Sequence, residues 1–336
     1  MDVELAAPPA YMQIEPVGQC NLRCRMCAIQ FRRDGLPPGP AAFIDFNLFT
    51  RLIDQARGLE ELHLQGLGEP LMHPRFFEMV RYAADRGIRV STNSNLTLLT
   101  ERRARECVDS GLHAIYVSLD GATPDTFEYV RVRARFGRVL RNLRRLLNVR
   151  AHNGGGPEIS LVAVTMRRNL AELPELVRLA HRLGVEWLYL QHLCHDFSEE
   201  SLPAQYRPMR DFVERETLVN EDPRRVAAVL DEVRALGARL GVKLRVPRLQ
   251  PQAYPPPAAG RGRCSWPWHG PYVSYAGDAM PCCMVGTPDR VRLGDLARDD
   301  LDSVWNGAAY REFRRRLASA APPAVCRGCA VYAGTF

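Results

Sequence analysis

Short apolar runs alternate with amphipathic helical patterns from the start of this chain to about residue 195. Six runs have the length and composition of β-strands, at residues 11–15, 61–65, 89–92, 114–119, 158–164 and 187–191. Helical patterns follow them, near residues 46–57, 75–86, 100–110, 124–150, 170–183 and 205–217. Because this order places consecutive strands side by side in one parallel sheet, the pattern predicts an α/β fold built from six βα units.

Three cysteines follow the first predicted strand. Cys20, Cys24 and Cys27 have the spacing CxxxCxxC. Three thiolates in one short loop can each hold one iron of a cubane 4Fe-4S cluster, which leaves the fourth iron without a protein ligand. An open iron predicts a cluster that takes part in chemistry. Zinc is the alternative, although zinc sites generally close four ligands from two CxxC-like pairs.

The cysteine spacing resembles the signature of the radical S-adenosylmethionine (SAM) enzymes. Met26 is a mild departure, because the family usually has an aromatic residue before the last cysteine. The resemblance implies a partial (β/α)6 TIM-like barrel in which the cluster loop follows the first strand. It also implies that the open iron binds SAM, and that reductive cleavage of SAM gives a 5'-deoxyadenosyl radical that abstracts hydrogen from an unactivated C–H bond.

The turn after the second predicted strand carries a second family motif. Residues 66–70 read Gly-Leu-Gly-Glu-Pro and resemble the motif that binds the SAM amino group, so Gly68, Glu69 and Pro70 are expected to bind the cofactor. Gly68 would allow close backbone approach. Glu69 or its neighbouring carbonyls could accept a hydrogen bond from an ammonium group.

Polar residues also end the third and fourth predicted strands, at the edge where function collects in barrels of this kind. The resemblance assigns SAM contacts to Asn93 and Ser118. Asp120 carries less weight, because Asp-Gly after a strand is a common turn pair and an aspartate can also cap a helix.

The sixth predicted strand leads into a dense set of reactive side chains. His192, Cys194, His195 and Asp196 follow it, and we expect catalytic roles for His192, Cys194 and Asp196. A carboxylate or an imidazole near the substrate could act as a base. Cys194 could return a hydrogen atom to a substrate radical, or it could simply be a buried small hydrophobic residue.

The remaining sequence divides into two further segments. We expect a radical SAM barrel over residues 1–197 and a helical and proline-rich connection over 198–262, with the helix at 222–241 as its clearest element. Residues 263–336 are expected to form a small C-terminal α+β iron–sulfur domain. A hairpin at residues 272–282 and helices near 301–317 lead there to a CxxC pair.

This C-terminal arrangement resembles the SPASM/twitch extension of radical SAM enzymes, which binds auxiliary 4Fe-4S clusters. The segment has five cysteines, so we expect one auxiliary cluster, closed by Cys264, Cys282, Cys326 and Cys329. Cys283 would then be spare, although it could replace Cys282 as a ligand. A structural zinc site closed by the same thiolates is the alternative. The ligand spacing is similar to that of aminoglycoside-tailoring enzymes such as the butirosin-pathway inosamine dehydrogenase.

The composition indicates in which compartment the protein works and which partners it binds. The 336 residues contain no run of about eighteen apolar residues and no signal peptide, so we expect a cytoplasmic protein without a membrane partner. Ten cysteines in a reducing compartment indicate metal binding. The net charge of +7 suits an acidic redox partner, and the family implies a flavodoxin or ferredoxin reductant. We do not expect a nucleic-acid partner.

Three reactions fit these features. The first is oxidation of a small, carbohydrate-like or natural-product substrate, with the auxiliary cluster as electron acceptor. The second is redox-neutral epimerisation with a cysteine as hydrogen donor. The third is modification of a ribosomal peptide, which the short segment before the first strand disfavours because it leaves no room for a leader-binding domain. A non-catalytic iron–sulfur or zinc protein would require the SAM motifs to be accidental.

Overall fold

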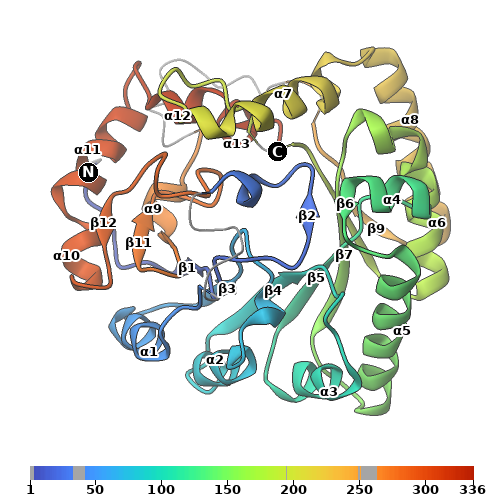
Figure 1. The fold of residues 1–336 in the computed structure, drawn as a ribbon, viewed down its shortest axis with the longest axis horizontal. Coiled ribbons are helices and arrows are strands. Elements are labelled where there is room, and N and C mark those ends of the chain that lie inside the picture. The colour runs from blue at the N-terminus through green and yellow to red at the C-terminus, as the bar shows by residue number, and fades with distance from the viewer. Residues whose placement is uncertain (1–3, 33–41, 194, 249, 251–262) are drawn as a thin grey trace.

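The protein is built around one long, mostly parallel sheet (Figure 1). The computed structural model describes residues 4–32, 42–193, 195–248, 250 and 263–336. Within these residues ten strands pair in the order β12-β11-β10-β1-β3-β4-β5-β7-β8-β9. They are β1 (Tyr11–Ile14), β3 (Glu61–Leu64), β4 (Arg89–Ser94), β5 (Ala114–Ser118), β7 (Glu158–Val164), β8 (Trp187–Gln191), β9 (Lys243–Arg245), β10 (Tyr272–Val273), β11 (Asp278–Met280) and β12 (Gly294–Asp295).

The middle of the sheet confirms the predicted α/β architecture. Strands β1, β3, β4, β5, β7 and β8 are parallel, and each pairs with the next one along this series. They match the six predicted strands to within two residues at each end. Consecutive parallel neighbours require a crossover helix each time, and these crossovers curve the sheet as in a partial TIM-like barrel.

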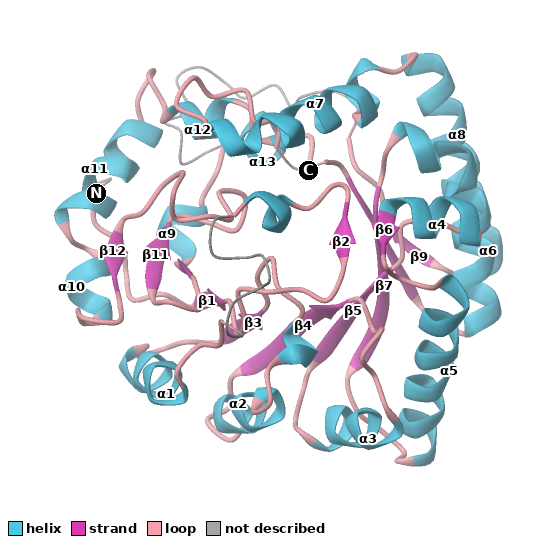
Figure 2. Cartoon of the chain, viewed as in Figure 1, coloured by secondary structure: helices cyan, strands magenta, loops and turns pink. Residues whose placement is uncertain are grey.

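The crossover helices cover the outer side of the sheet (Figure 2). They are α1 (Phe46–Gln55), α2 (Phe76–Ala84), α3 (Glu101–Asp109), α4 (Pro124–Val130), α5 (Phe136–His152), α6 (Leu173–Leu183) and α8 (Pro223–Leu240). Helix α7 (Arg207–Glu216) instead packs Met209 and Val213 against the segment of residues 26–31. Each is amphipathic; α6, for example, buries Leu173, Leu176 and Val177 and ends at Gly184 in the left-handed conformation. No helix among the described residues is both long and apolar enough to span a bilayer.

The helix predicted at 124–150 is wrong as one element. The chain leaves the helix after Val130, and β6 (Arg131–Val132) pairs antiparallel with β2 (Arg23–Cys24) in the cluster loop. Arg133 then takes a positive φ of 76°, and a new helix begins at Phe136. The strand pair connects the fourth βα unit directly to the cysteine loop.

The C-terminal segment adds to the free edge of the same sheet. Strand β10 pairs parallel with β1, so that Gln13 lies beside Tyr272. Strands β11 and β12 continue antiparallel, which confirms the predicted hairpin. Small helices surround this edge: α9 (Trp266–His269), α10 (Leu301–Trp305), α11 (Ala308–Leu317), α12 (Ala324–Arg327) and α13 (Ala330–Ala333).

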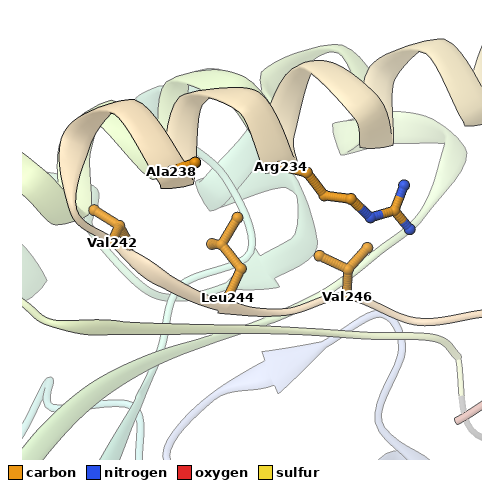
Figure 3. A pocket seen from close by; sticks show the side chains of 5 residues that line it. All are labelled: Arg234, Ala238, Val242, Leu244 and Val246. Atoms are coloured by element: carbon orange, nitrogen blue, oxygen red, sulfur yellow. The ribbon is translucent and has the colours of Figure 1, made fainter.

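Strand β9, from the predicted connecting segment, extends the opposite edge of the sheet beside β8. Next to it lies a shallow surface groove between α8 and β9, drawn in Figure 3, where Arg234, Ala238 and Val246 contribute side chains. This groove contains one arginine and otherwise aliphatic groups. It therefore offers neither metal ligands nor catalytic side chains, and the reactive residues lie elsewhere.

Candidate functional site

The cysteine loop follows β1, and its three cysteines lie beside the residues at the carboxyl ends of the strands. Cys24 is buried because β2 holds it against Arg131 of β6, while Cys20 and Cys27 are partly buried. The Cys27 N–H donates to the carbonyl oxygen of Cys24, 3.0 Å away, and turns the loop between the two thiols. The loop thus turns three thiols toward one space.

That space is a cavity of about 350 Å³, at the lower end of the range for small-molecule sites. The three cysteines line it together with groups from the strand ends and from the C-terminal segment. Its polar and sulfur-bearing lining residues are Gln13, Cys20, Cys24, Met26, Cys27, Gln65, Glu69, Asn93, Ser94, Asn95, Ser118, Arg131, Gln191, His192, His195, Met209, Tyr272, Cys283, Met284 and Arg290. Five predicted residues other than the cysteines therefore meet in one cavity: Gly68, Glu69, Asn93, Ser118 and His192.

The electrostatics of the three thiols suit a metal cluster. Burial raises the pKa of each, to about 12 for Cys24, because a thiolate loses hydration there. Two donors approach the sulfurs: Nδ2 of Asn95 lies 3.8 Å from Sγ of Cys20, and a guanidinium nitrogen of Arg131 lies 3.9 Å from Sγ of Cys24. Bound iron would supply the positive charge that these buried thiols need in order to ionise.

The turn at residues 66–70 packs against the backbone that leads into the cysteine loop, at Val17 and Gln19. A Cβ on Gly68 would lie 1.9 Å from the carbonyl oxygen of Val17, so only glycine fits. The backbone N–H of Glu69 donates to the carbonyl oxygen of Gln19 at 3.0 Å. Pro70 is buried at the start of a short 3-10 helix and is not among the residues that line the cavity.

The Glu69 carboxylate is occupied within the protein. It accepts hydrogen bonds from the Ser94 hydroxyl at 2.6 Å and from the backbone N–H groups of Asn95 and Leu71. Burial raises its pKa. An ammonium group needs a hydrogen-bond acceptor at this turn, either the Glu69 carboxylate or a neighbouring backbone carbonyl. The backbone carbonyls are better suited, because the carboxylate already accepts these three hydrogen bonds.

Asp120 proves to be an ion-pair partner and not a turn or capping residue. Its carboxylate lies 2.6 Å from Nε of Arg131 and also accepts from the N–H of Val164. Thr123 caps α4 instead. Sequence reasoning missed Arg131 because it lies in an arginine-rich run with continuous helical periodicity; its pairing with the cysteine loop is a long-range contact.

The residues after β8 divide into three cases. His192 is buried, lines the cavity and donates from Nε2 to the carbonyl oxygen of Arg248 at 2.7 Å. His195 also lines it, but Nε2 contacts the carbonyl oxygen of Val325 and Nδ1 accepts from the N–H of Phe197. Cys194 lies outside the described residues.

Asp196 is not at the cavity, contrary to the expectation of a catalytic role. Its side chain is half exposed, accepts from the N–H of Ser198 and lies against Gly328. The strand ends at Gln191, and the chain then bends so that the Asp196 N–H pairs with the carbonyl of Gly328. This bend turns the Asp196 carboxylate toward α12 and α13.

The four predicted auxiliary ligands lie around a second, smaller space. Cys264, Cys282, Cys326 and Cys329 line a pocket of about 20 Å³ together with apolar side chains that include Trp266, Phe313 and Leu317. Burial raises the pKa of all four thiols, to about 11 for Cys264. In the described residues no three His, Cys, Asp or Glu side chains are arranged to hold a single metal ion; in a cubane each thiolate reaches a different iron.

The two spaces share a wall. His195, Met284 and Val285 line both the large cavity and the small pocket. Cys283, unlike its neighbour Cys282, lines the large cavity, and it also packs with Cys264 and Cys326 against the apolar cluster of the C-terminal segment. Tyr272, Arg290, Gln13 and Gln65 also line that cavity and were not predicted; their positions depend on β10 joining β1, for which local sequence gives no signal.

Comparison with known families matches both halves of the chain. Residues 14–180 match the radical SAM superfamily, and residues 264–330 match the SPASM iron–sulfur cluster-binding domain. The tungsten-containing aldehyde ferredoxin oxidoreductase cofactor-modifying protein of Pyrococcus furiosus is 32% identical over 188 residues, 54% of this chain and 51% of that protein. The chain thus spans about half the length of that relative. The PqqA peptide cyclase of Ruegeria pomeroyi is 27% identical over 332 residues, 97% of this chain and 81% of that enzyme.

Solved structures show the same fold. SuiB of Streptococcus suis, bound to its precursor peptide SuiA, superposes with a TM-score of 0.70 at 15% identity, covering 98% of this chain and 71% of SuiB. BtrN, in complex with AdoMet and 2-DOIA, gives a TM-score of 0.51 at 13% identity, covering 97% of this chain and 94% of BtrN. At these identities the likeness concerns the fold.

Proposed function

Because the chain belongs to the radical SAM superfamily and carries a SPASM iron–sulfur cluster-binding domain, we propose that it oxidises a small polar substrate by radical hydrogen abstraction. Its cofactors are a 4Fe-4S cluster, SAM and an auxiliary iron–sulfur cluster. When bound, SAM and its cluster supply a hydrogen-abstracting 5'-deoxyadenosyl radical, and the auxiliary cluster supplies an acceptor for the second electron.

We assign the first cluster to Cys20, Cys24 and Cys27, beside which a guanidinium nitrogen of Arg131 lies 3.9 Å from Sγ of Cys24. The backbone at Gly68 and Glu69, with Asn93 and Ser118, forms the proposed SAM site, and Pro70 shapes the turn. Arg131 and Asp120 neutralise each other, so this side of the cavity holds a fixed ion pair that does not need rearranging when the cofactor binds.

The observation that most supports an oxidation is that the large cavity and the small cysteine pocket share a wall. A substrate in the large cavity would be separated from the pocket of Cys264, Cys282, Cys326 and Cys329 by the layer that contains His195, Met284 and Val285. Four thiolates would ligate every iron of an auxiliary cubane, which suits electron transfer better than binding of substrate to iron. The apolar lining of the pocket excludes water from that cluster.

His192 is the proposed base. Burial lowers its pKa below the usual 6.5, so the imidazole is neutral near pH 7 and can take a proton. A substrate radical on a carbon that bears a hydroxyl group becomes a carbonyl when it loses that proton and one electron. Asp196 is less suited, because it lies away from the cavity.

Two other outcomes have specific support. A redox-neutral epimerisation needs a thiol in the cavity, and Cys283 is one in addition to the predicted Cys194. A peptide substrate is supported by similarity to a peptide cyclase over nearly the whole chain. We expect a cytoplasmic flavodoxin or ferredoxin as the reductant in all three cases.

The test of the proposed function is anaerobic reconstitution followed by an iron count. We expect about eight irons per chain, and about four in the Cys20→Ala/Cys24→Ala/Cys27→Ala variant. Only the wild type should convert SAM into 5'-deoxyadenosine under dithionite. If the wild type binds two clusters and forms no 5'-deoxyadenosine, the radical SAM assignment of this site is wrong. If 5'-deoxyadenosine does form, an aminocyclitol and a peptide are compared as substrates. The oxidation state of the product then decides between oxidation and epimerisation.

A further inference from the structure

Two adjacent cysteines point to different spaces. Cys282 lines the small apolar pocket with the other three predicted auxiliary ligands, whereas Cys283 lines the large cavity. With Cys282 as the proposed fourth ligand, Cys283 is not needed as one, and it lies between the auxiliary set, whose Cys264 and Cys329 help to raise the pKa of its thiol, and the large cavity. Its thiol is therefore available to the contents of the large cavity.

Tyr272 lies next to Cys283 and has an unused hydroxyl group. Its side chain is 2% exposed and lines the large cavity, and its electrostatic neighbours are Glu15, Arg32 and Cys283. Within the described residues the hydroxyl oxygen makes no hydrogen bond of acceptable distance and angle. The backbone N–H of Leu67 lies near it, but that N–H donates to Oε1 of Glu15 at 3.1 Å. By contrast, the equally buried hydroxyl of Tyr310 donates to the carbonyl oxygen of Met280 at 2.7 Å.

An unsatisfied buried hydroxyl destabilises the free protein, because it has lost its hydration without gaining a partner. Four buried side-chain atoms in the described residues share this property, on Glu199, Tyr272, Thr287 and Arg314. Of these four residues, Tyr272 is the one that lines the large cavity. The missing partner is thus expected inside that cavity.

We propose that Tyr272 and Cys283 form the substrate-facing wall that the SPASM segment contributes to the radical cavity. The Tyr272 hydroxyl binds a hydroxyl, amine or amide group of the substrate, and the Cys283 thiol contacts the substrate beside it. This inference rests on the proposed function, because it takes the large cavity as the place where the radical forms. It selects substrates that carry a hydrogen-bonding group near the reacting carbon, whether on a sugar or a peptide.

The first test compares two tyrosines in the reconstituted enzyme without substrate. Tyr272→Phe removes an unpartnered hydroxyl, so its Tm should equal or exceed that of the wild type. Tyr310→Phe is the matched control; it leaves the carbonyl oxygen of Met280 without its donor and should lower Tm by a few degrees. If Tyr272→Phe lowers Tm as Tyr310→Phe does, the Tyr272 hydroxyl has a partner within the protein and the proposal is overturned.

The second test uses the exchangeable hydrogen of the thiol. In D2O with SAM and dithionite but no substrate, the 5'-deoxyadenosyl radical can take deuterium from the Cys283 S–D group, which is a weaker bond than an aliphatic C–H bond. The products are monodeuterated 5'-deoxyadenosine and a thiyl radical, which takes an electron from dithionite and a deuteron from solvent to restore the thiol. Cys283→Ser should lose most of the deuterated fraction of the 5'-deoxyadenosine, and Tyr310→Phe should keep it.

Iron counts accompany the second test. Cys283→Ser should keep the wild-type iron content, whereas Cys282→Ser should lose the auxiliary cluster. Loss of iron in Cys283→Ser, or an unchanged deuterated fraction, would overturn the proposal. The total amount of 5'-deoxyadenosine tests the radical SAM chemistry itself, so failure of the inference is distinguishable from failure of the proposed function.

Discussion

Replacing Gly68 with alanine tests how the second motif supports the cluster loop. The Cβ would lie 1.9 Å from the carbonyl oxygen of Val17 and 2.7 Å from that of Gln19. Both contacts are with backbone, so no side-chain rotation relieves them. The loop must retreat by about 1.5 Å to reach the ordinary contact distance of 3.4 Å.

The cost follows from that displacement. Overpacking of this kind costs about 1–3 kcal/mol, and separation of the two segments also breaks the hydrogen bond from Glu69 to Gln19, worth about 0.5–1.5 kcal/mol. We therefore expect Gly68→Ala to lose about 2–4 kcal/mol of the free energy of unfolding. Cys20 follows Gln19 directly, so the same shift should weaken binding of the first cluster and not that of the auxiliary cluster.

The assay is urea unfolding together with iron content and the electron paramagnetic resonance signals of the two reduced clusters. Gly155→Ala is the matched control, because a Cβ there meets no atom within 4 Å; it should change stability by less than about 0.5 kcal/mol. If Gly68→Ala keeps both the wild-type stability and the first cluster, the turn does not brace the cysteine loop and the reasoning fails.

Three further predictions concern charged groups around the cavity. Arg131→Met leaves Asp120 buried and unpaired and removes the cation near Cys24, so it should lower the free energy of unfolding in urea by about 3–5 kcal/mol. Arg131→Lys should restore part of that loss, and wild-type stability of Arg131→Met would contradict the prediction. His192→Gln should lower product formation by roughly 10²–10⁴-fold while 5'-deoxyadenosine still forms. Burial lowers the pKa of His192, so the activity of the wild type should be constant above pH 6.5 and should fall in more acidic solution as the imidazole gains a proton. If the activity of His192→Gln falls in the same way at acidic pH, another group is responsible for the decrease. Glu15→Gln removes the buried carboxylate that pairs with Arg32 at 2.8 Å and should cost about 3 kcal/mol or more by the same measurement.

Local sequence determined most of the barrel and the cysteine sets. The six strands could be predicted because their residues alternate or run apolar over the right length, and the short loops between them leave little freedom of topology. The cysteine spacing is similarly local. The helix at 124–150 was misread because its periodicity continues through Arg131, while the observed break depends on pairing between Arg131 and Cys24, 107 positions earlier.

Side-chain roles at the cavity depend on contacts that sequence does not encode locally. His195 stood in a reactive cluster, yet the carbonyl of Val325 and the N–H of Phe197 engage its two nitrogens. Asp196 is drawn away by its pairing with Gly328. Both results arise where the end of β8 meets the C-terminal cysteine segment, whose Val325 lies 130 positions beyond His195 in the chain.

The pairing of β10 with β1 explains why the two cysteine sets belong to one site. Gln13 and Ile14 lie beside Tyr272 and Val273, so the strand that leads into the SAM-cluster loop is also the neighbour of the strand that leads toward Cys282. The antiparallel strand β11 then returns the chain, so that Met280 lies beside Tyr272, and Cys282 and Cys283 follow near the start of β10. The radical cavity and the auxiliary pocket are therefore adjacent because of strand order, and the residues just after β11 form the boundary between them. A substitution that disrupts β10 should consequently disturb electron transfer from the cavity even when all seven predicted cluster ligands are intact.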